Sequence, residues 1–142
     1  MPKVDRVMRK ADDDQPVVDT TGKGLGVRGT PVNGVADVDL NKDGTVVPNG
    51  KGMSVVPGWR DLPYFLVPKR LTGQFPGARG KADTFCFTMG ERPFQNGPVA
   101  TGRDLQQDAP THGNIVPPQF VSLDQFQQDL AHTRQSWTID EV

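Results

Sequence analysis

The fold class is decided by the stretch SLDQFQQDLAHTRQSW, residues 122–137. Ser122 and Gln125 have the spacing of a helix capping box, and Val121 and Phe126 have the spacing of a hydrophobic staple. Asp124 adds a negative charge where a helix dipole is positive. Apolar positions recur every three or four residues, as on one face of a helix, at Leu123, Phe126, Leu130, Thr133 and Trp137. The stretch therefore predicts an amphipathic helix over residues 122–137 that packs on the rest of the fold.

Upstream of this helix, the chain is a succession of short β-type runs separated by glycine and proline. Proline cannot donate a ladder hydrogen bond, so the prolines at 31, 48, 57, 63 and 68 limit the length of each strand. The predicted strands are Leu25–Arg28, Val35–Leu40, Thr45–Val47, Met53–Val56, Tyr64–Val67 and Thr84–Met89. Strands followed by a C-terminal helix predict an α+β fold.

The length of 142 residues is that of one domain. Residues 1–23 have no sustained apolar period and include the acidic run Asp12-Asp13-Asp14. We expect a mobile N-terminal arm, or at most one short helix, over residues 1–23. A single domain is expected over residues 24–142.

Charge and hydropathy exclude two classes of partner. The chain has 16 Lys and Arg against 17 Asp and Glu, for a net charge of -1. This leaves no surplus of cations for nucleic-acid binding by bulk charge. The longest apolar runs are far too short to span a membrane, and the N-terminus has no apolar signal-peptide region. We expect a protein made in the cytoplasm, with no membrane partner.

A partial calcium-loop motif and the single cysteine both have simpler structural interpretations. Asp39-Leu-Asn-Lys-Asp-Gly44 matches the first half of a calcium loop, but Gly50 stands where the bidentate glutamate belongs. An Asp-Gly turn between two strands is the favoured reading, and we predict no metal site. Cys86, the single cysteine, lies in the apolar run Phe85-Cys-Phe87, which is typical of a buried thiol.

The two histidines differ in their expected surroundings. His112 lies between proline and glycine in PTHGNIVP, residues 110–117, and is expected at a turn that enters a short strand, within reach of solvent. His132 lies off the apolar face of the predicted helix and is expected at the surface. The glycine-rich runs Gly22-Lys-Gly24-Leu-Gly26 and Gly50-Lys-Gly52 resemble phosphate loops but match no complete motif, so flexible turns are the favoured interpretation. The backbone amides of Gly50 and Gly52 could still approach a ligand closely.

Three segments together carry a family resemblance: Val27-Arg28, then DGTVVPNGKGMSV (residues 43–55), then THGNIVP (residues 111–117) leading to the helix that ends at Trp137. This pattern resembles the bacteriostatic type VI-secreted toxin family with an ADP-ribosyltransferase-like fold. The resemblance implies two antiparallel sheets that form a nucleotide-sized cleft, with NAD as cofactor. It also implies a cytoplasmic target, delivery by secretion into a target cell, and a neutralising immunity protein as partner.

The resemblance also implies roles for single residues. Arg28, expected on the first core strand, would pair with the phosphates of NAD, since a guanidinium binds anionic oxygens bidentately. Gly52, Met53 and Ser54 would contact the cofactor, with Ser54 orienting a ribose. Ser54 and His112 would be the catalytic pair, with His112 at the reacting end.

The sequence departs from the general transferase pattern at one point. Such enzymes carry a glutamate on a late strand, but residues 111–119 contain no acid. Glu91 and Glu141 are poorly placed substitutes, and His112 or Gln119 could replace the acid.

Two alternatives stay open. One is a catalytically inactive relative that is the protein-binding module of a toxin–neutraliser pair, and the other is a structural domain without a ligand. Residues 83–99 are also longer than the family suggests, and could add a strand pair.

Overall fold

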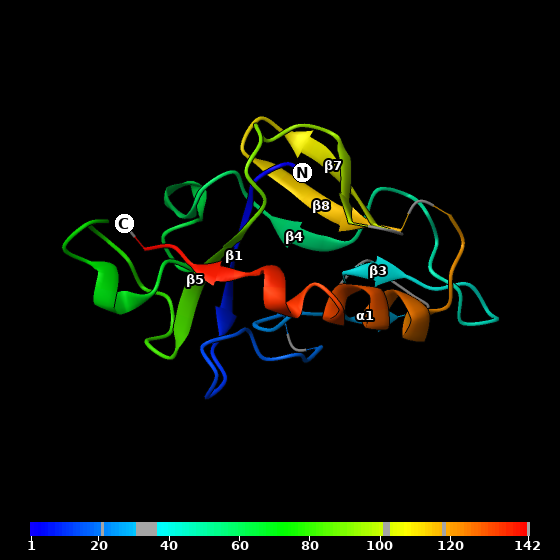
Figure 1. Cartoon of the computed structure of the whole chain (residues 1–142), viewed down its shortest axis with the longest axis horizontal. Helices are drawn as coiled ribbons and strands as arrows, with labels where there is room; N and C mark the ends of the chain where they lie inside the picture. The colour runs from blue at the N-terminus through cyan, green and yellow to red at the C-terminus, as the bar shows by residue number, and fades with distance from the viewer. Residues whose placement is uncertain (21, 31–36, 101–102, 118, 142) are drawn as a thin grey trace.

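Two antiparallel sheets and a C-terminal helix make up the fold (Figure 1). The computed structural model describes residues 1–20, 22–30, 37–100, 103–117 and 119–141. The first sheet has the order β1 (Val4–Arg9), β5 (Thr84–Met89) and β9 (Thr138–Ile139). The second has the order β4 (Met53–Val55), β8 (His112–Val116), β7 (Arg103–Ala109) and β6 (Gly97–Ala100). The α+β prediction is confirmed at this level.

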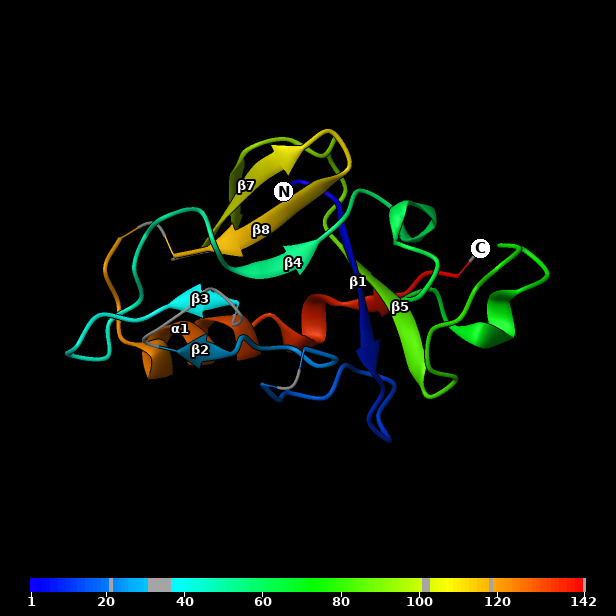
Figure 2. The ribbon, with the colours of Figure 1, turned by 180° about the vertical axis from the view of Figure 1, so that it is seen from behind.

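The remaining elements are short. A parallel pair, β2 (Gly29–Thr30) and β3 (Val38–Asp39), lies beside the helix α1 (Leu123–Ala131), as the view from behind shows (Figure 2). Single 3-10 turns occur at η1 (Trp59–Asp61), η2 (Lys69–Leu71) and η3 (Arg134–Ser136). No helix among the described residues is long and apolar enough to cross a membrane.

Strand β1 joins the two sheets. It pairs along its whole length with β5, from Val4 opposite Met89 to Arg9 opposite Thr84. On its other side, Asp5 and Val56 exchange two backbone hydrogen bonds, of 2.7 and 2.9 Å, just beyond the end of β4. The sheets are therefore tied at one point, and their strands run in different directions away from it (Figure 1).

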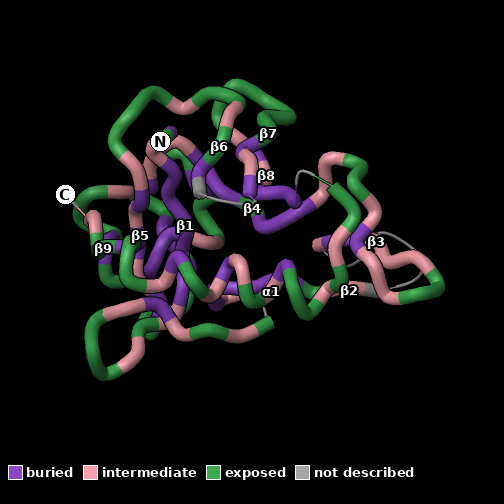
Figure 3. Tube along the Cα trace, turned by 45° about the vertical axis from the view of Figure 1, so that its right-hand side comes forward, coloured by how far each residue is buried: buried purple, intermediate pink, exposed green. Residues whose placement is uncertain are grey.

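The N-terminal arm predicted for residues 1–23 is therefore wrong where β1 lies. Figure 3 shows β1 as buried, and Val4, Asp5 and Met8 are fully buried. Side chains on one face of this sheet join the main core around Phe126 and Trp137, whereas Val7 and Cys86 join a second core on the other face. Because both faces are covered, the strand shows no alternation of apolar and polar residues, which is the signal that reveals a half-buried strand.

Five other predicted elements differ in part from the structure. One is Thr45–Val47, which forms no strand but only single-residue bridges, of Thr45 with Ser122 and of Val46 with Leu40. Leu25–Arg28 is irregular, and β2 begins at Gly29, directly after the end of this predicted strand. Tyr64–Val67 contains a turn, in which the N–H of Leu66 donates to the carbonyl of Pro63. Residues 35–36 of Val35–Leu40 lie outside the described residues. The extra strand pair predicted within 83–99 is wrong, because β5 pairs with β1 and β9 while β6 pairs with β7.

The C-terminal helix is confirmed at its start and shorter at its end. The hydroxyl of Ser122 accepts a 3.0 Å hydrogen bond from the N–H of Gln125. After Ala131 the chain continues into a 3-10 turn at 134–136, and the hydroxyl of Thr133 donates to the carbonyl of Leu130 at 2.6 Å. Trp137 remains fully buried, so the predicted apolar face is retained.

Candidate functional site

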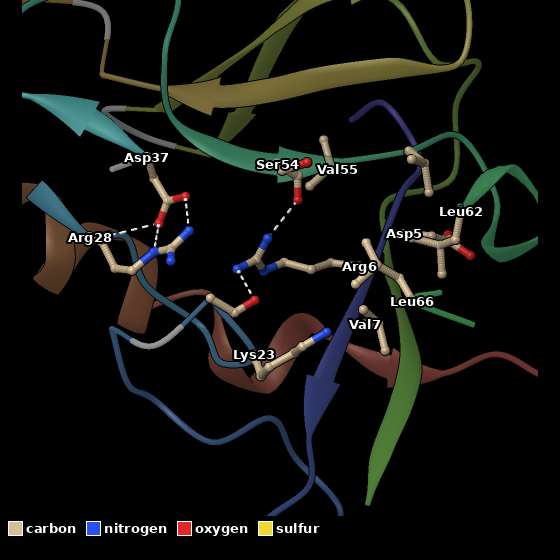
Figure 4. A pocket seen from close by; sticks show the side chains of 12 residues that line it. Asp5, Arg6, Val7, Lys23, Arg28, Asp37, Ser54, Val55, Leu62 and Leu66 are labelled. Atoms are coloured by element: carbon tan, nitrogen blue, oxygen red, sulfur yellow. Dashed lines mark hydrogen bonds and ion pairs between the residues drawn. The ribbon is translucent and has the colours of Figure 1, made fainter. Parts of the chain in front are cut away.

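A pocket of about 280 Å³ lies where the two sheets diverge from their common point (Figure 4). Strand β1 forms one side, the end of β4 forms another, and the segment around Lys23 closes the third. The lining residues are Asp5, Arg6, Val7, Gly22, Lys23, Arg28, Asp37, Ser54, Val55, Val56, Leu62 and Leu66. Three of them are cations, and Figure 4 shows the Arg6 guanidinium between Ser54 and the segment around Lys23, with Arg28 beside Asp37.

Arg6 of β1 is a buried cation held by backbone carbonyls. It is only 7% exposed, and Nη1 donates to the carbonyl of Ser54 at 2.8 Å. Its other donors reach the carbonyls of Gly22 and Gly24 at 3.2–3.3 Å. Burial lowers the pKa of Arg6 to about 10. Because its partners are neutral carbonyls, its positive charge favours an anion in the pocket.

Lys23 and Arg28 add two further positive charges. Burial, together with the charge of Arg6, lowers the pKa of Lys23 below its ordinary 10.5. Arg28 pairs with Asp37 through Nε and Nη2, at 3.2 and 3.1 Å, and its backbone N–H also donates to that carboxylate at 2.8 Å. This hydrogen bonding raises the pKa of Arg28. Asp37 therefore neutralises Arg28.

Ser54 and His112, predicted as a catalytic pair, are brought together by the second sheet. The hydroxyl Oγ of Ser54 lies 2.7 Å from Nε2 of His112. The other ring nitrogen, Nδ1, lies 2.6 Å from Oδ1 of Asp108 at the end of β7. His112 begins β8 directly after a turn and its side chain is 38% exposed, as predicted. The three side chains form a continuous serine–histidine–aspartate hydrogen-bond chain.

The structure places two of the four predicted cofactor residues at the pocket and the other two away from it. Arg28 and Ser54 both line the pocket, although Arg28 lies just before β2 and not on the first core strand. Met53 is 1% exposed and belongs to the main core. Gly52 packs against the backbone of Ile115, where a Cβ would collide with the carbonyl oxygen. Its missing side chain thus serves the contact between β4 and β8.

The acids considered as substitutes for a late glutamate lie elsewhere. Glu91 pairs with the N-terminal amine at 2.8 Å, and Glu141 pairs with Arg70 at 2.7 Å. Neither lines the pocket, whereas Asp37 does. Gln119 is exposed. Asp37 is 19% exposed in its side chain, so it is a carboxylate that a ligand in the pocket can meet.

The Asp-Gly segment, Cys86 and His132 have the structural roles that were predicted for them. Asp43 accepts hydrogen bonds from the N–H and hydroxyl of Thr45, at 3.0 and 2.6 Å, within a turn that brings Leu40 opposite Val46. The predicted Asp-Gly turn is confirmed. Cys86 is fully buried, and burial raises its pKa to about 12. His132 is exposed at the end of α1, as predicted.

Sequence reasoning missed Arg6 and Asp108, and it considered Lys23 only as part of a glycine-rich run for which a flexible turn is the favoured interpretation. Arg6 was assigned to the arm, and its basic charge in VDRVMR gives no sign that it is buried. Asp108 reaches His112 because a register irregularity between Gln107 and Ala109 adds a residue to β7. A spacing of four residues between Asp108 and His112, with Pro110 between them, is a signal that could have suggested a hairpin contact.

No family model matches the sequence, and no curated protein matches it.

Proposed function

We propose that the pocket binds NAD and that the chain is a toxin-like ADP-ribosyltransferase acting on a cytoplasmic target of the cell that receives it. The observation that carries the proposal is the convergence of Arg6, Lys23 and Arg28 on one pocket beside Ser54. The pyrophosphate of NAD is an anion that such a set of donors would hold. The family resemblance of residues 25–137 supports NAD among the possible anions.

The pocket volume is at the small end of the range for ligand sites, so it would hold part of a dinucleotide. Arg6 and Lys23 would face the phosphates, and Arg28 would join them when its pairing with Asp37 opens. Ser54 would orient the ribose beside the pocket. His112 would lie at the reacting end, where the bond between nicotinamide and ribose breaks through a cation-like transition state.

Binding and turnover test the proposal separately. Calorimetric titration with NAD should show saturable binding, and free nicotinamide should accumulate. Lys23→Gln and Arg28→Ala should weaken binding, whereas Ser54→Ala and His112→Ala should mainly reduce nicotinamide release. Lys42→Gln is the matched control, because Lys42 is an exposed lysine of the Asp-Gly turn outside the pocket. No binding at millimolar NAD would contradict the proposal.

A second candidate function is the protein-binding module of a toxin–neutraliser pair. The observation that favours it is the exposed aromatic pair Tyr64 and Phe65, which are 54% and 56% exposed, with ring centroids 5.7 Å apart. Exposed aromatic side chains are typical of protein interfaces. A co-expressed neutraliser that still binds Ser54→Ala and His112→Ala but loses binding to Tyr64→Ala would favour this function over catalysis.

A further inference from the structure

The direction of each hydrogen bond in the Ser54–His112–Asp108 chain follows from elementary chemistry. An ionised carboxylate can only accept, so Nδ1 of His112 donates its proton to Asp108. In a neutral ring, Nε2 then carries a lone pair and accepts the hydroxyl proton of Ser54. The imidazole is therefore held in the one tautomer that can remove a proton from the serine hydroxyl.

Three strands of the second sheet hold this arrangement. Ser54 lies opposite Asn114 in the β4–β8 register, and His112 is two residues before Asn114, on the same face. A two-residue turn at Pro110 and Thr111 returns the chain from β7 to β8. The irregularity in β7 places Asp108 beside His112. The alignment is thus built into the sheet and its hairpin.

The hydroxyl of Ser54 is accessible, and the backbone carbonyl of the same residue accepts a hydrogen bond from Arg6. Ser54 is exposed, so a substrate can reach it without any movement of the protein. Ser54 also lines the pocket that contains Arg6, Lys23 and Arg28. Arg6 and Lys23 attract a substrate that carries a negative charge, whereas Arg28 is paired with Asp37.

We propose that Ser54 is a nucleophile for acyl transfer from small esters that carry a negative charge, with His112 as general base and Asp108 as the residue that positions His112. Oγ of Ser54 attacks the ester carbonyl carbon while its proton passes to Nε2 of His112. The bond from that carbon to the alkoxide oxygen breaks, and His112 returns the proton to the leaving alcohol. Water, deprotonated by His112, then releases the carboxylic acid and restores Ser54.

Labelling with a fluorophosphonate probe tests the nucleophile directly. The reaction forms a bond between Oγ and phosphorus and expels fluoride, so it requires an activated serine and no NAD. We expect one adduct per chain, mapped to Ser54 by mass spectrometry, and none in Ser54→Ala. His112→Ala should slow labelling by about 100-fold or more. Ser136→Ala, which removes another exposed serine, should label like the wild type.

The role of Asp108 has its own signature. In the wild-type protein at pH 8, where an ordinary imidazole is neutral, the nitrogen NMR shifts of His112 should show Nδ1 protonated and Nε2 free. Asp108→Asn should shift the ring toward a mixture of tautomers and slow labelling by about tenfold or more. Equal shifts and equal labelling in the variant would exclude this positioning role.

The charge of the substrate is tested with two esters of similar length. A 4-nitrophenyl ester whose acyl chain ends in a carboxylate should be hydrolysed with a kcat/KM at least about fivefold above that of the neutral 4-nitrophenyl pentanoate. Lys23→Gln should reduce this preference. Equal rates for the two esters would overturn the proposed substrate class.

Three results would overturn the nucleophile itself. They are no adduct on the folded wild-type chain, adducts on serines other than Ser54, and labelling that His112→Ala leaves unchanged. Thermal unfolding and circular dichroism establish that each variant is folded, and His112→Gln replaces His112→Ala if the alanine variant does not fold. Because no step uses NAD, these outcomes are independent of the NAD titration.

Discussion

Single side chains decide which ligand charge the pocket favours. Arg6 is bonded to neutral carbonyls, and Lys23 is a partly buried ammonium near it, while the carboxylates of Asp37 and Asp83 act on these two cations through their charge alone. Arg28 differs, because Asp37 pairs with it through two side-chain hydrogen bonds. Lys23 and Asp37 can therefore be changed to move affinity for an anion in opposite directions.

Removing the charge of Lys23 should weaken anion binding and make it less dependent on pH. We expect Lys23→Gln to bind NAD about five- to tenfold more weakly, the equivalent of roughly 1 to 1.4 kcal/mol. In the wild type, affinity should fall as pH rises through the alkaline range below 10.5, because burial lowers the pKa of Lys23 and the ammonium loses its proton there. Calorimetry at several pH values checks this, and an equally steep pH profile in the variant would contradict it.

Removing the charge of Asp37 should strengthen anion binding. Asp37→Asn frees Arg28 to face the ligand, and we expect NAD to bind about fivefold more tightly, or roughly 1 kcal/mol. Asp39→Asn is the matched control, since Asp39, on β3, pairs with Lys51 and does not line the pocket. Weaker binding by Asp37→Asn than by the control variant would show that Asp37 itself contacts the ligand.

At the scale of elements, the start of α1 depends on a local hydrogen bond. Ser122→Ala leaves the N–H of Gln125 without its side-chain acceptor and should destabilise the protein by about 1 kcal/mol. Thermal or urea unfolding measures the change. Ser136→Ala removes an exposed serine that makes no cap and should change the free energy of unfolding by less than about 0.5 kcal/mol. Equal losses in the two variants would mean that the cap is not the cause.

At the scale of the whole molecule, β1 connects two sheets that otherwise have separate strands. Deleting residues 1–10 would expose the edge of β5 and remove the two hydrogen bonds between Asp5 and Val56. It would also remove Val4 and Met8 from the main core. We expect the truncated chain to lose cooperative unfolding, measured by circular dichroism during heating. A cooperative transition near that of the full chain would support a dispensable arm instead.

Cys86 reports on the same global transition from inside the fold. Its thiol is fully buried between the sheet and the second core, and burial raises its pKa to about 12. In the folded protein at pH 8, we expect no reaction with Ellman's reagent over minutes, because the thiolate is the reactive form. In denaturing urea, one thiol per chain should react at once. Rapid reaction of the folded protein would contradict this placement.

Features that depend on near neighbours can be predicted from the amino-acid sequence alone. The cap at Ser122, the Asp-Gly turn at 43–44 and the strand Thr84–Met89 all follow from residues a few positions apart. Local hydrogen bonds and side-chain periodicity leave a readable pattern over such distances. Ser54 and His112 were singled out only through the family resemblance; the structure shows that their side chains are in contact, and their catalytic role stays a prediction.

Features that depend on pairing between distant residues are visible only in the folded chain. β1 is a strand because residues some 80 positions away cover it, as with Val4 opposite Met89. The same pairing buries Arg6 and turns an apparent surface residue into the centre of the pocket. Asp108 joins Ser54 and His112 through a shift in strand register, which no local pattern encodes. Burial and register are properties of packed strands, so they arise only when the chain has folded.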